Sequence, residues 1–226
     1  MARILIVGGH GKVALLLAPV LVARGDEVTS VIRNPAHADD VRAAGATPAV
    51  FDVEHEDRPA LAELIAGHDA VVWSAGAGGG SPARTRAVDF EAAVRSMDAA
   101  KDAGAARYVM VSYFGSSPDH GIPESDPFHA YAEAKAAADE YLRATSLEWT
   151  VLGPSRLTLG EGTGRIDAAA QTSGEVSRKN VALVVAQALV EPATIGRTIR
   201  FNDGDVAIPE ALAGEPPDQP PISPRG

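Results

Sequence analysis

The feature that most constrains the fold is a glycine-rich segment directly after the first apolar run of the chain. Residues 4–7 read ILIV, and residues 8–14 read GGHGKVA. The glycines satisfy both G-x-G-x-x-A, starting at Gly9, and G-x-x-G-x-x-A, starting at Gly8. Between a strand and a helix, this pattern allows a tight turn that a pyrophosphate can approach closely. We therefore predict a dinucleotide-binding βαβ unit, with the phosphates at the helix N-terminus.

Short β-branched runs alternate with longer helical patterns through the first two thirds of the chain. The expected strands are Ile4–Val7, Glu27–Ile32, Thr47–Phe51, Ala70–Ser74, Arg107–Ser112 and Glu148–Leu152. The expected helices are Val13–Arg24, Ala36–Ala44, Ala60–Ala66, Thr85–Ala103 and His129–Thr145. Several strands are continuously apolar, as strands covered on both faces are. We predict an α/β fold, a Rossmann doubly wound parallel sheet with helices on both faces.

The alternation becomes less regular after Leu152. Five glycines lie within residues 153–174, before a further helical pattern at Val181–Val190 and a last strand at Arg197–Phe201. We predict that residues 1–152 form an NAD(P)-binding Rossmann domain and that residues 153–212 are a small C-terminal portion completing the same domain at the substrate site. Residues 213–226 form a proline-rich tail, a composition that favours extended structure without a core.

Composition excludes several classes of function. The chain has 30 acidic and 20 basic residues, a net charge of −10, and no cysteine. This charge disfavours nucleic-acid binding, and the lack of cysteine removes thiol nucleophiles, disulfides and Cys-based metal centres. The longest apolar stretch, Ala14–Ala23, is too short to span a bilayer, and the N-terminus lacks a signal-peptide pattern. We expect no membrane partner and a cytoplasmic location, and the spacing of His and carboxylates predicts no metal site.

The end of the second predicted strand bears on the choice of cofactor. In dinucleotide-binding sheets an acid at this position binds the adenosine ribose, whereas an arginine accommodates the 2′-phosphate of NADP. Here the strand is followed by Arg33, and Lys12 lies in the glycine turn. We predict that the two cations clamp the 2′-phosphate and favour NADP over NAD. The alternative is that Arg33 is a solvated surface charge.

Two further strand ends contribute to the predicted cofactor site. Asp52 and Val53 follow the third strand, beside the expected adenine, although Asp52 is nearly as well explained as a turn residue. A glycine-rich loop follows the fourth strand, where we expect the nicotinamide ribose. The predicted cofactor-binding residues are Gly8, Gly9, His10, Gly11, Lys12, Val13, Arg33, Asp52, Val53, Ser74, Ala75, Gly76 and Lys135.

Tyr131 and Lys135 form a Y-x-x-x-K pair, one turn apart on one face of a predicted helix. A protonated lysine beside a phenol lowers the pKa of the phenol, so that the tyrosine can exchange a proton with a carbonyl or hydroxyl group while hydride moves. Ser112, at the end of the fifth strand, is placed to donate a hydrogen bond to the substrate oxygen. These three residues predict the catalytic group of an oxidoreductase.

Together these motifs resemble the short-chain dehydrogenase/reductase superfamily, and more narrowly its atypical, NAD(P)-dependent epimerase/dehydratase-like and NmrA-like branch. The resemblance runs from about Arg3 to Leu212. It rests on Gly8-x-x-Gly11-x-x-Ala14, Asp52-Val53, Ser112, Tyr131-x-x-x-Lys135 and the segments 152–158 and 177–182. It implies that Tyr131 donates or accepts the proton, that Lys135 holds the nicotinamide ribose and that Ser112 orients the substrate.

The chain departs from the wider superfamily at two positions. Asp89 stands where the catalytic tetrad has Asn, as is often so in this branch, and we include it in the predicted catalytic group. Gly153 stands where related sequences commonly have Arg, so that a substrate or phosphate contact is in doubt.

The leading hypothesis is an NADP(H)-dependent oxidoreductase that reduces a small carbonyl compound. The alternatives are a non-catalytic NADP-binding redox sensor, motivated by Asp89 and Gly153, and a nucleotide-sugar epimerase or dehydratase, for which the C-terminal portion is short. We expect the substrate between the glycine loop after the fourth strand, residues 113–128 and residues 160–174. His120 and His129, as isolated loop histidines, are not expected to be catalytic. The sequence predicts a small-molecule substrate without identifying it, and a homodimer is one oligomeric state that the sequence allows.

Overall fold

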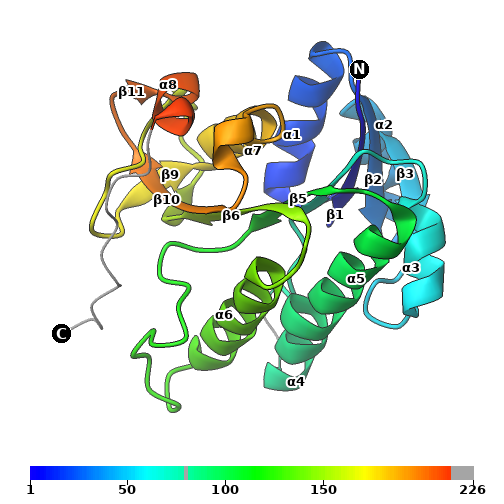
Figure 1. The fold of residues 1–226 in the computed structure, drawn as a ribbon, viewed down its shortest axis with the longest axis horizontal. Coiled ribbons are helices and arrows are strands. Elements are labelled where there is room, and N and C mark those ends of the chain that lie inside the picture. The colour runs from blue at the N-terminus through cyan, green and yellow to red at the C-terminus, as the bar shows by residue number, and fades with distance from the viewer. Residues whose placement is uncertain (79–80, 215–226) are drawn as a thin grey trace.

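The protein, seen in a computed structural model that describes residues 1–78 and 81–214, is a central sheet covered by helices on both faces (Figure 1). The strands of this sheet are β1 (Arg3–Val7), β2 (Glu27–Ile32), β3 (Thr47–Val50), β4 (Ala70–Trp73), β5 (Arg107–Val111), β6 (Glu148–Pro154), β8 (Arg165–Asp167), β10 (Arg197–Asp203) and β11 (Val206–Ala207). Their order is β11-β8-β10-β6-β5-β4-β1-β2-β3. All neighbours from β3 to β10 pair in parallel, and only the edge strand pairs β10–β8 and β8–β11 are antiparallel. The predicted Rossmann fold is confirmed.

The helices divide into two groups, one on each face of the sheet (Figure 1). One face carries α1 (Lys12–Ala23), α2 (Ala38–Ala43), α7 (Arg178–Ala188) and α8 (Ile208–Ala213). The other carries α3 (Arg58–Ile65), α4 (Pro82–Thr85), α5 (Ala93–Ala103) and α6 (His129–Arg143). Each face has its own hydrophobic core: Ile4 and Ile6 of β1 pack into one, and Leu5 and Val7 into the other. The continuous apolar run of β1 thus reflects burial on both faces.

The crossover in the strand order determines where a ligand can bind. From β1 the chain proceeds outward through β2 and β3, and then returns to place β4 on the other side of β1. The loops after β1 and β4 therefore lead to opposite halves of the sheet and leave a crevice between them. The glycine turn follows β1, and the loop beginning at Ser74 follows β4.

Two parts of the chain are less regular than the sequence pattern predicts. The helix expected over Thr85–Ala103 is three segments, α4, the π-helix η2 (Arg86–Ala92) and α5. Short 3₁₀ turns, η1 (Pro35–His37) and η3 (Pro192–Thr194), precede α2 and β10. The C-terminal portion adds a small parallel sheet of β7 (Arg156–Thr158) and β9 (Glu175–Ser177).

The C-terminal portion shares its core with the first half of the chain. Ile166, Val176 and Phe201 belong to the same hydrophobic cluster as Ile4 and Leu17. Most of the predicted proline-rich tail, residues 215–226, lies outside the described residues. Within the described part of the chain, no helix combines the length and apolar character needed to cross a bilayer.

Candidate functional site

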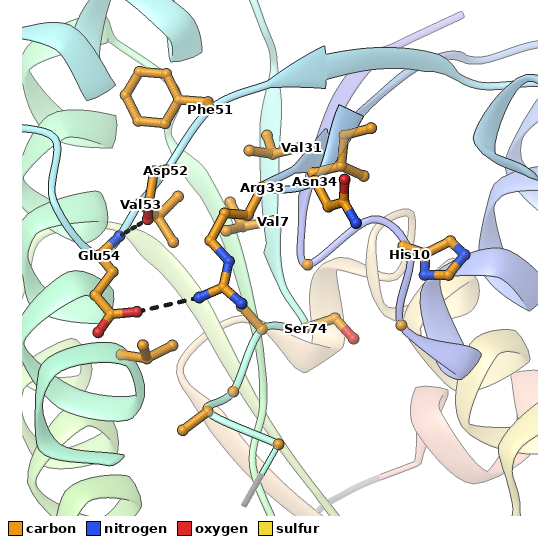
Figure 2. Close-up of a pocket in the computed structure, with 18 of the residues that line it drawn as sticks. Val7, His10, Val31, Arg33, Asn34, Phe51, Asp52, Val53, Glu54 and Ser74 are labelled. Atoms are coloured by element: carbon orange, nitrogen blue, oxygen red, sulfur yellow. Dashed lines mark hydrogen bonds and ion pairs between the residues drawn. The ribbon is translucent and has the colours of Figure 1, made fainter. Parts of the chain in front are cut away.

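A cavity of about 480 Å³ lies at the carboxyl ends of β1 to β4, where the strand order reverses (Figure 2). The predicted cofactor-binding residues that line it are Gly8, His10, Gly11, Arg33, Asp52, Val53, Ser74, Ala75 and Gly76. Of the others, Gly9 and Val13 are buried beside the turn, Lys12 is exposed at the first position of α1, and Lys135 lies in α6. The sequence motifs from four separate strand ends are thus gathered around one cavity.

The glycine turn fits a dinucleotide because side chains are excluded from it. Gly8 has a φ of +86°, and a Cβ atom there would lie 2.7 Å from the Cα atom of Ala75. A Cβ atom on Gly9 would lie 2.5 Å from the Cβ atom of Ser30. Gly11 is the N-cap of α1, whose first N–H groups have no partner within the helix. A bare backbone and a helix N-terminus at one cavity form a cradle for a pyrophosphate.

Arg33 crosses the cavity toward Glu54, as Figure 2 shows. Its Nη1 atom lies 3.5 Å from Oε2 of Glu54, and 57% of its side chain is exposed. The same carboxylate oxygen lies 3.3 Å from Nε of Arg84, whose Nη1 donates to the carbonyl of Ala77. Arg33 thus lies at the cavity, whereas Lys12 is not among its lining residues. Of the two residues of the predicted clamp, the structure thus places Arg33 at the cavity wall.

His10 points away from Arg33 to the other edge of the cavity (Figure 2). Its ring stacks on His37 with the centroids 3.7 Å apart, and its Nε2 atom lies 2.8 Å from Oδ2 of Asp40. The side chain of His10 is therefore engaged with η1 and α2, while its position in the turn places its backbone beside the cavity.

Asp52 lies in the turn after β3, at the edge of the cavity. Its carboxylate accepts a hydrogen bond from the backbone N–H of Glu54 at 3.1 Å and lies 3.0 Å from Nδ1 of His55. Burial raises the pKa of Asp52, but His55, the Glu54 N–H and the charge of Arg33 outweigh burial and hold the pKa below its usual value. Asp52 therefore stabilises the turn after β3 and also lines the cavity.

Lys135 is fully buried on the face of α6 that meets β5. Its Nζ atom donates to the carbonyl of Val111 at 3.0 Å and lies 3.3 Å from the sulfur of Met110. Burial lowers the pKa of Lys135, while the charges of Asp139 and Asp89 act in the opposite direction. Lys135 therefore lies against the end of β5, close to two buried acids.

Ser112, which is predicted to donate a hydrogen bond to the substrate oxygen, is hydrogen-bonded to a carboxylate of the protein. Its hydroxyl donates to Oδ2 of Asp139 at 2.5 Å, and the hydroxyl of Ser116 donates to the same oxygen at 2.5 Å. The sequence analysis did not identify Asp139 or Ser116. The signal for Asp139 was present, because Asp139 follows Lys135 by four residues and so extends the Tyr131–Lys135 face by one more turn.

The pKa of Tyr131 is raised, in contrast to the lowering expected from Lys135. Burial raises the pKa of Tyr131, and the charges of Asp89 and Asp139, together with Tyr113, raise it further. The ring of Tyr131 lies 5.6 Å from that of Tyr113 and 5.0 Å from that of Phe128, centroid to centroid. Tyr131 is therefore a protonated phenol at neutral pH.

Asp89 lies between the Tyr131–Lys135 pair and the cofactor cavity. It is 1% exposed in η2, and its Oδ2 atom accepts the N–H of Ala77 at 3.0 Å. A Cβ atom on Gly76 would lie 2.8 Å from Oδ1 of Asp89, so only glycine fits there without a shift. Burial raises the pKa of Asp89, although the Ala77 N–H, Lys135 and Arg84 oppose this effect. Asp89 thus holds the loop after β4, one wall of the cavity, against the Tyr131–Lys135 side.

The cavity covers the predicted cofactor site and does not extend to the region predicted for the substrate. The wall of the 480 Å³ cavity does not include Tyr131, Lys135, Ser112 or residues 160–174. At Gly153, a Cβ atom would lie 3.1 Å from Cγ of Arg200 and 3.2 Å from the carbonyl oxygen of Tyr113. A side chain at this position would therefore require Arg200 or the backbone of Tyr113 to shift slightly.

Two clusters of His and carboxylate side chains, the residue types that bind metal ions, are present among the described residues. The sequence spacing did not reveal them. His120, His129 and Glu133 form one, and Asp52, Glu54 and His55 form the other. In the first, Nδ1 of His120 accepts the N–H of Ile122, so its Nε2 must carry the proton that it shares with Glu133 at 2.9 Å. Neither nitrogen of neutral His120 then offers a free lone pair. The cluster therefore joins residues 113–128 to α6 by hydrogen bonds.

The fold and the cavity define a class of protein. The glycine turn, the cavity at the crossover of the sheet and the helix with the Y-x-x-x-K pair are typical of Rossmann-fold proteins that bind nicotinamide dinucleotides. The family model described as NAD(P)H-binding matches residues 8–192, and the chain belongs to this family. A UPF0659 protein of Schizosaccharomyces pombe is 32% identical over 95% of each chain. The resemblance to the atypical, epimerase/dehydratase-like branch of the short-chain dehydrogenases/reductases is thus confirmed.

Two solved structures share both the fold and appreciable sequence identity. One is a Bacillus halodurans protein described as an NAD-dependent epimerase/dehydratase, with a TM-score of 0.86 and 29% identity over 94% of this chain and 99% of its own. The other is the oxidoreductase YlbE of Lactococcus lactis, with a TM-score of 0.83 and 30% identity over 93% of this chain and 94% of its own.

Proposed function

We propose that this protein is an NADP(H)-dependent oxidoreductase that reduces a small carbonyl compound. The observation that supports the proposal is the link that Asp89 makes between the loop that walls the cofactor cavity and the Tyr131–Lys135 pair of α6. Asp89 bonds this loop at Ala77 and acts electrostatically on both Tyr131 and Lys135. The bound nicotinamide would supply the hydride.

The residues of the chain have distinct roles in the proposed reaction. Tyr131 is the proton donor, because burial keeps its phenol protonated at neutral pH. Lys135, buried and hydrogen-bonded to the end of β5, places a positive charge beside Asp89 and Asp139, the two acids whose charges disfavour the phenolate left after proton donation. The turn at Gly8 and the N-terminus of α1 hold the pyrophosphate, and the loop from Ser74 to Gly76 borders the nicotinamide ribose.

The preference for NADP rests on Arg33. Its guanidinium lies at the cavity, with Glu54 at 3.5 Å as its ion-pair partner. A 2′-phosphate would offer a stronger, doubly charged partner than this long and partly exposed contact. Asn34, the next residue, also lines the cavity, and an acid at the end of β2 that would favour NAD is absent.

A sugar-nucleotide epimerase or dehydratase is the second candidate, because the Bacillus halodurans relative is described as an NAD-dependent epimerase/dehydratase. Such an enzyme regenerates its cofactor and consumes no NADPH. The short C-terminal portion supports the simpler reductase, since it leaves little chain to enclose a sugar nucleotide.

Tyr131→Phe tests the proposed proton donor. With NADPH and a panel of small aldehydes and ketones, we expect the variant to lose at least about 100-fold in turnover, the usual contribution of a general acid. Its NADPH affinity should stay within about twofold, because the phenol lies outside the cavity wall. Tyr141→Phe, on the same helix but 37% exposed and bonded to Asp98, is the matched control and should retain full turnover. Equal activity of the Tyr131 variant would exclude Tyr131 as the acid.

A further inference from the structure

Asp139 is a buried carboxylate in direct contact with a residue of the proposed catalytic group. Its side chain is 0% exposed, two turns along α6 from Tyr131. Its Oδ2 atom accepts hydrogen bonds from the hydroxyls of Ser112 and Ser116, each at 2.5 Å. Its Oδ1 atom is buried and has no hydrogen-bond partner among the described residues. A fully buried carboxylate is costly, so this arrangement calls for a reason.

The two hydroxyl contacts set the direction of the hydrogen bonds at Ser112. A hydroxyl has one proton and two lone pairs, and an ionised carboxylate only accepts. If Asp139 is ionised, the proton of Ser112 points toward Asp139, and only lone pairs face the remaining side of the Ser112 oxygen. Lys135, buried on the same face of α6, supplies the positive charge that balances Asp139.

We propose that Asp139 is a positioning residue that holds the protons of Ser112 and Ser116, so that Ser112 acts as a hydrogen-bond acceptor toward the substrate while Tyr131 is the donor. This inference rests on the proposed reductase function of the site. Ser112 then meets a substrate group that carries a hydrogen, a hydroxyl or an N–H beside the reacting carbonyl. A bare carbonyl oxygen at Ser112 would face lone pairs, and binding it there would require the Ser112–Asp139 bond to break.

The titration of the Tyr131 phenol can show whether Asp139 is ionised. The titratable groups that act on Tyr131 are Asp89 from η2, Asp139 from α6 and Tyr113 from the segment after β5. Lys135 of α6 acts on the two acids, Asp89 and Asp139. A negative charge on Asp139 disfavours the Tyr131 phenolate, whereas a protonated Asp139 has no such effect. A serine bonded to a protonated Asp139 would be free to donate to the substrate. The titration of residue 131 therefore distinguishes the two directions of the Ser112 hydrogen bond.

The experiment places 3,5-difluorotyrosine, whose phenol is more acidic than that of tyrosine, at position 131 of the full chain and follows its titration by ¹⁹F NMR. In Asp139→Asn we expect the phenol to ionise about one pH unit lower than in the otherwise unchanged chain, the effect of removing one nearby negative charge. Asp39→Asn, an exposed acid paired with Arg42, removes the same charge elsewhere and should leave the titration unchanged. An unchanged titration in Asp139→Asn would overturn the proposal.

Circular dichroism shows whether Asp139→Asn folds, and a second variant tests the proposal if it does not. Asp139→Leu combined with Ser112→Ala and Ser116→Ala removes the carboxylate together with both hydroxyl donors. No donor or acceptor of these three hydrogen-bonded side chains is then left without a partner. The same lowering is expected there, and its absence would equally contradict the proposal. Neither NADPH nor substrate enters this titration. A failure of the reductase function would therefore leave the result intact, and an unchanged titration would refute the role of Asp139 alone.

Discussion

At the scale of single residues, the site is organised by buried acids as much as by the tyrosine and lysine. Asp89 and Asp139 are 1% and 0% exposed, and both act on the fully buried Lys135. One positive charge thus faces two acids in a region shielded from water, where each charge acts strongly on its neighbours. Tyr131 is held protonated by this environment, which suits a donor of protons.

Arg33 is the residue on which the proposed preference for NADP depends. Arg33→Ala should raise the Kd of NADPH about tenfold or more, because a hydrogen bond to a charged phosphate contributes about 1.5–3 kcal/mol. The Kd of NADH should change by less than about twofold, since NADH lacks the 2′-phosphate. Isothermal titration calorimetry measures both.

Arg42→Ala provides the control for this substitution. Arg42 is an exposed arginine of α2 paired with Asp39, and it does not line the cavity. Its replacement should leave both dissociation constants unchanged. Equal weakening of NADPH and NADH by Arg33→Ala would show that Arg33 does not read the phosphate.

Sequence reasoning at this scale succeeds for backbone constraints and fails for hydrogen-bond direction. The positive φ of Gly8 and the crowding at Gly9 follow from the motif, because only glycine fits such a turn. The engagement of Ser112 by Asp139 depends on a contact between residues 27 positions apart, and the pairing of Arg33 with Glu54 on one 21 positions apart. Spacing alone does not specify such contacts.

At the scale of elements, Arg107 links the start of β5 to the C-terminal portion of the chain. It is 8% exposed at the start of β5, and Nη2 donates to the hydroxyls of Thr150 and Thr194 and to the carbonyl of Ala188. Nη1 donates to the carbonyl of Glu148 at 2.5 Å. Burial lowers the pKa of Arg107 to about 10, although the charge of Glu148 opposes this, so it stays charged at neutral pH.

Arg107→Met should lower the free energy of unfolding by about 3 kcal/mol, because removing the cation leaves several buried acceptors without a donor. Urea denaturation at pH 7 measures the loss. The matched variant is Arg143→Met, since Arg143 is only partly buried and donates to Thr198 at 3.2 Å. We expect that variant to lose less than about 1 kcal/mol. Similar losses in both would contradict a linking role for Arg107.

The elements that sequence periodicity missed are short or irregular. β1 to β6, α1, α5 and α6 follow from runs long enough to show a period. β7, β8, β9 and β11 have only two or three residues each, too few for any pattern. The π-helix η2 interrupts a sequence that reads as one continuous helix, and it carries Asp89. Such bulges occur frequently at functional sites, but they arise from tertiary packing rather than from composition.

At the scale of the whole molecule, an acidic protein must attract a polyanionic cofactor by local means. The net charge of −10 opposes the approach of NADP(H) at long range. At the cavity, Arg33, Arg84 and the N-terminus of α1 offer positive potential within a few ångströms. The crossover of the sheet brings these features together, so that the fold rather than the overall charge creates the binding site.

The most direct test of the account follows a labelled hydride through the unmodified protein. NADPH carrying deuterium at the transferring position of nicotinamide C4 is incubated with the protein and a panel of small carbonyl compounds, and products are analysed by mass spectrometry. We predict that one alcohol product gains a single deuterium while an equal amount of NADPH is oxidised. NADPH that binds but transfers no deuterium to any member of the panel, or substrate that is converted without net oxidation of NADPH, would contradict the account.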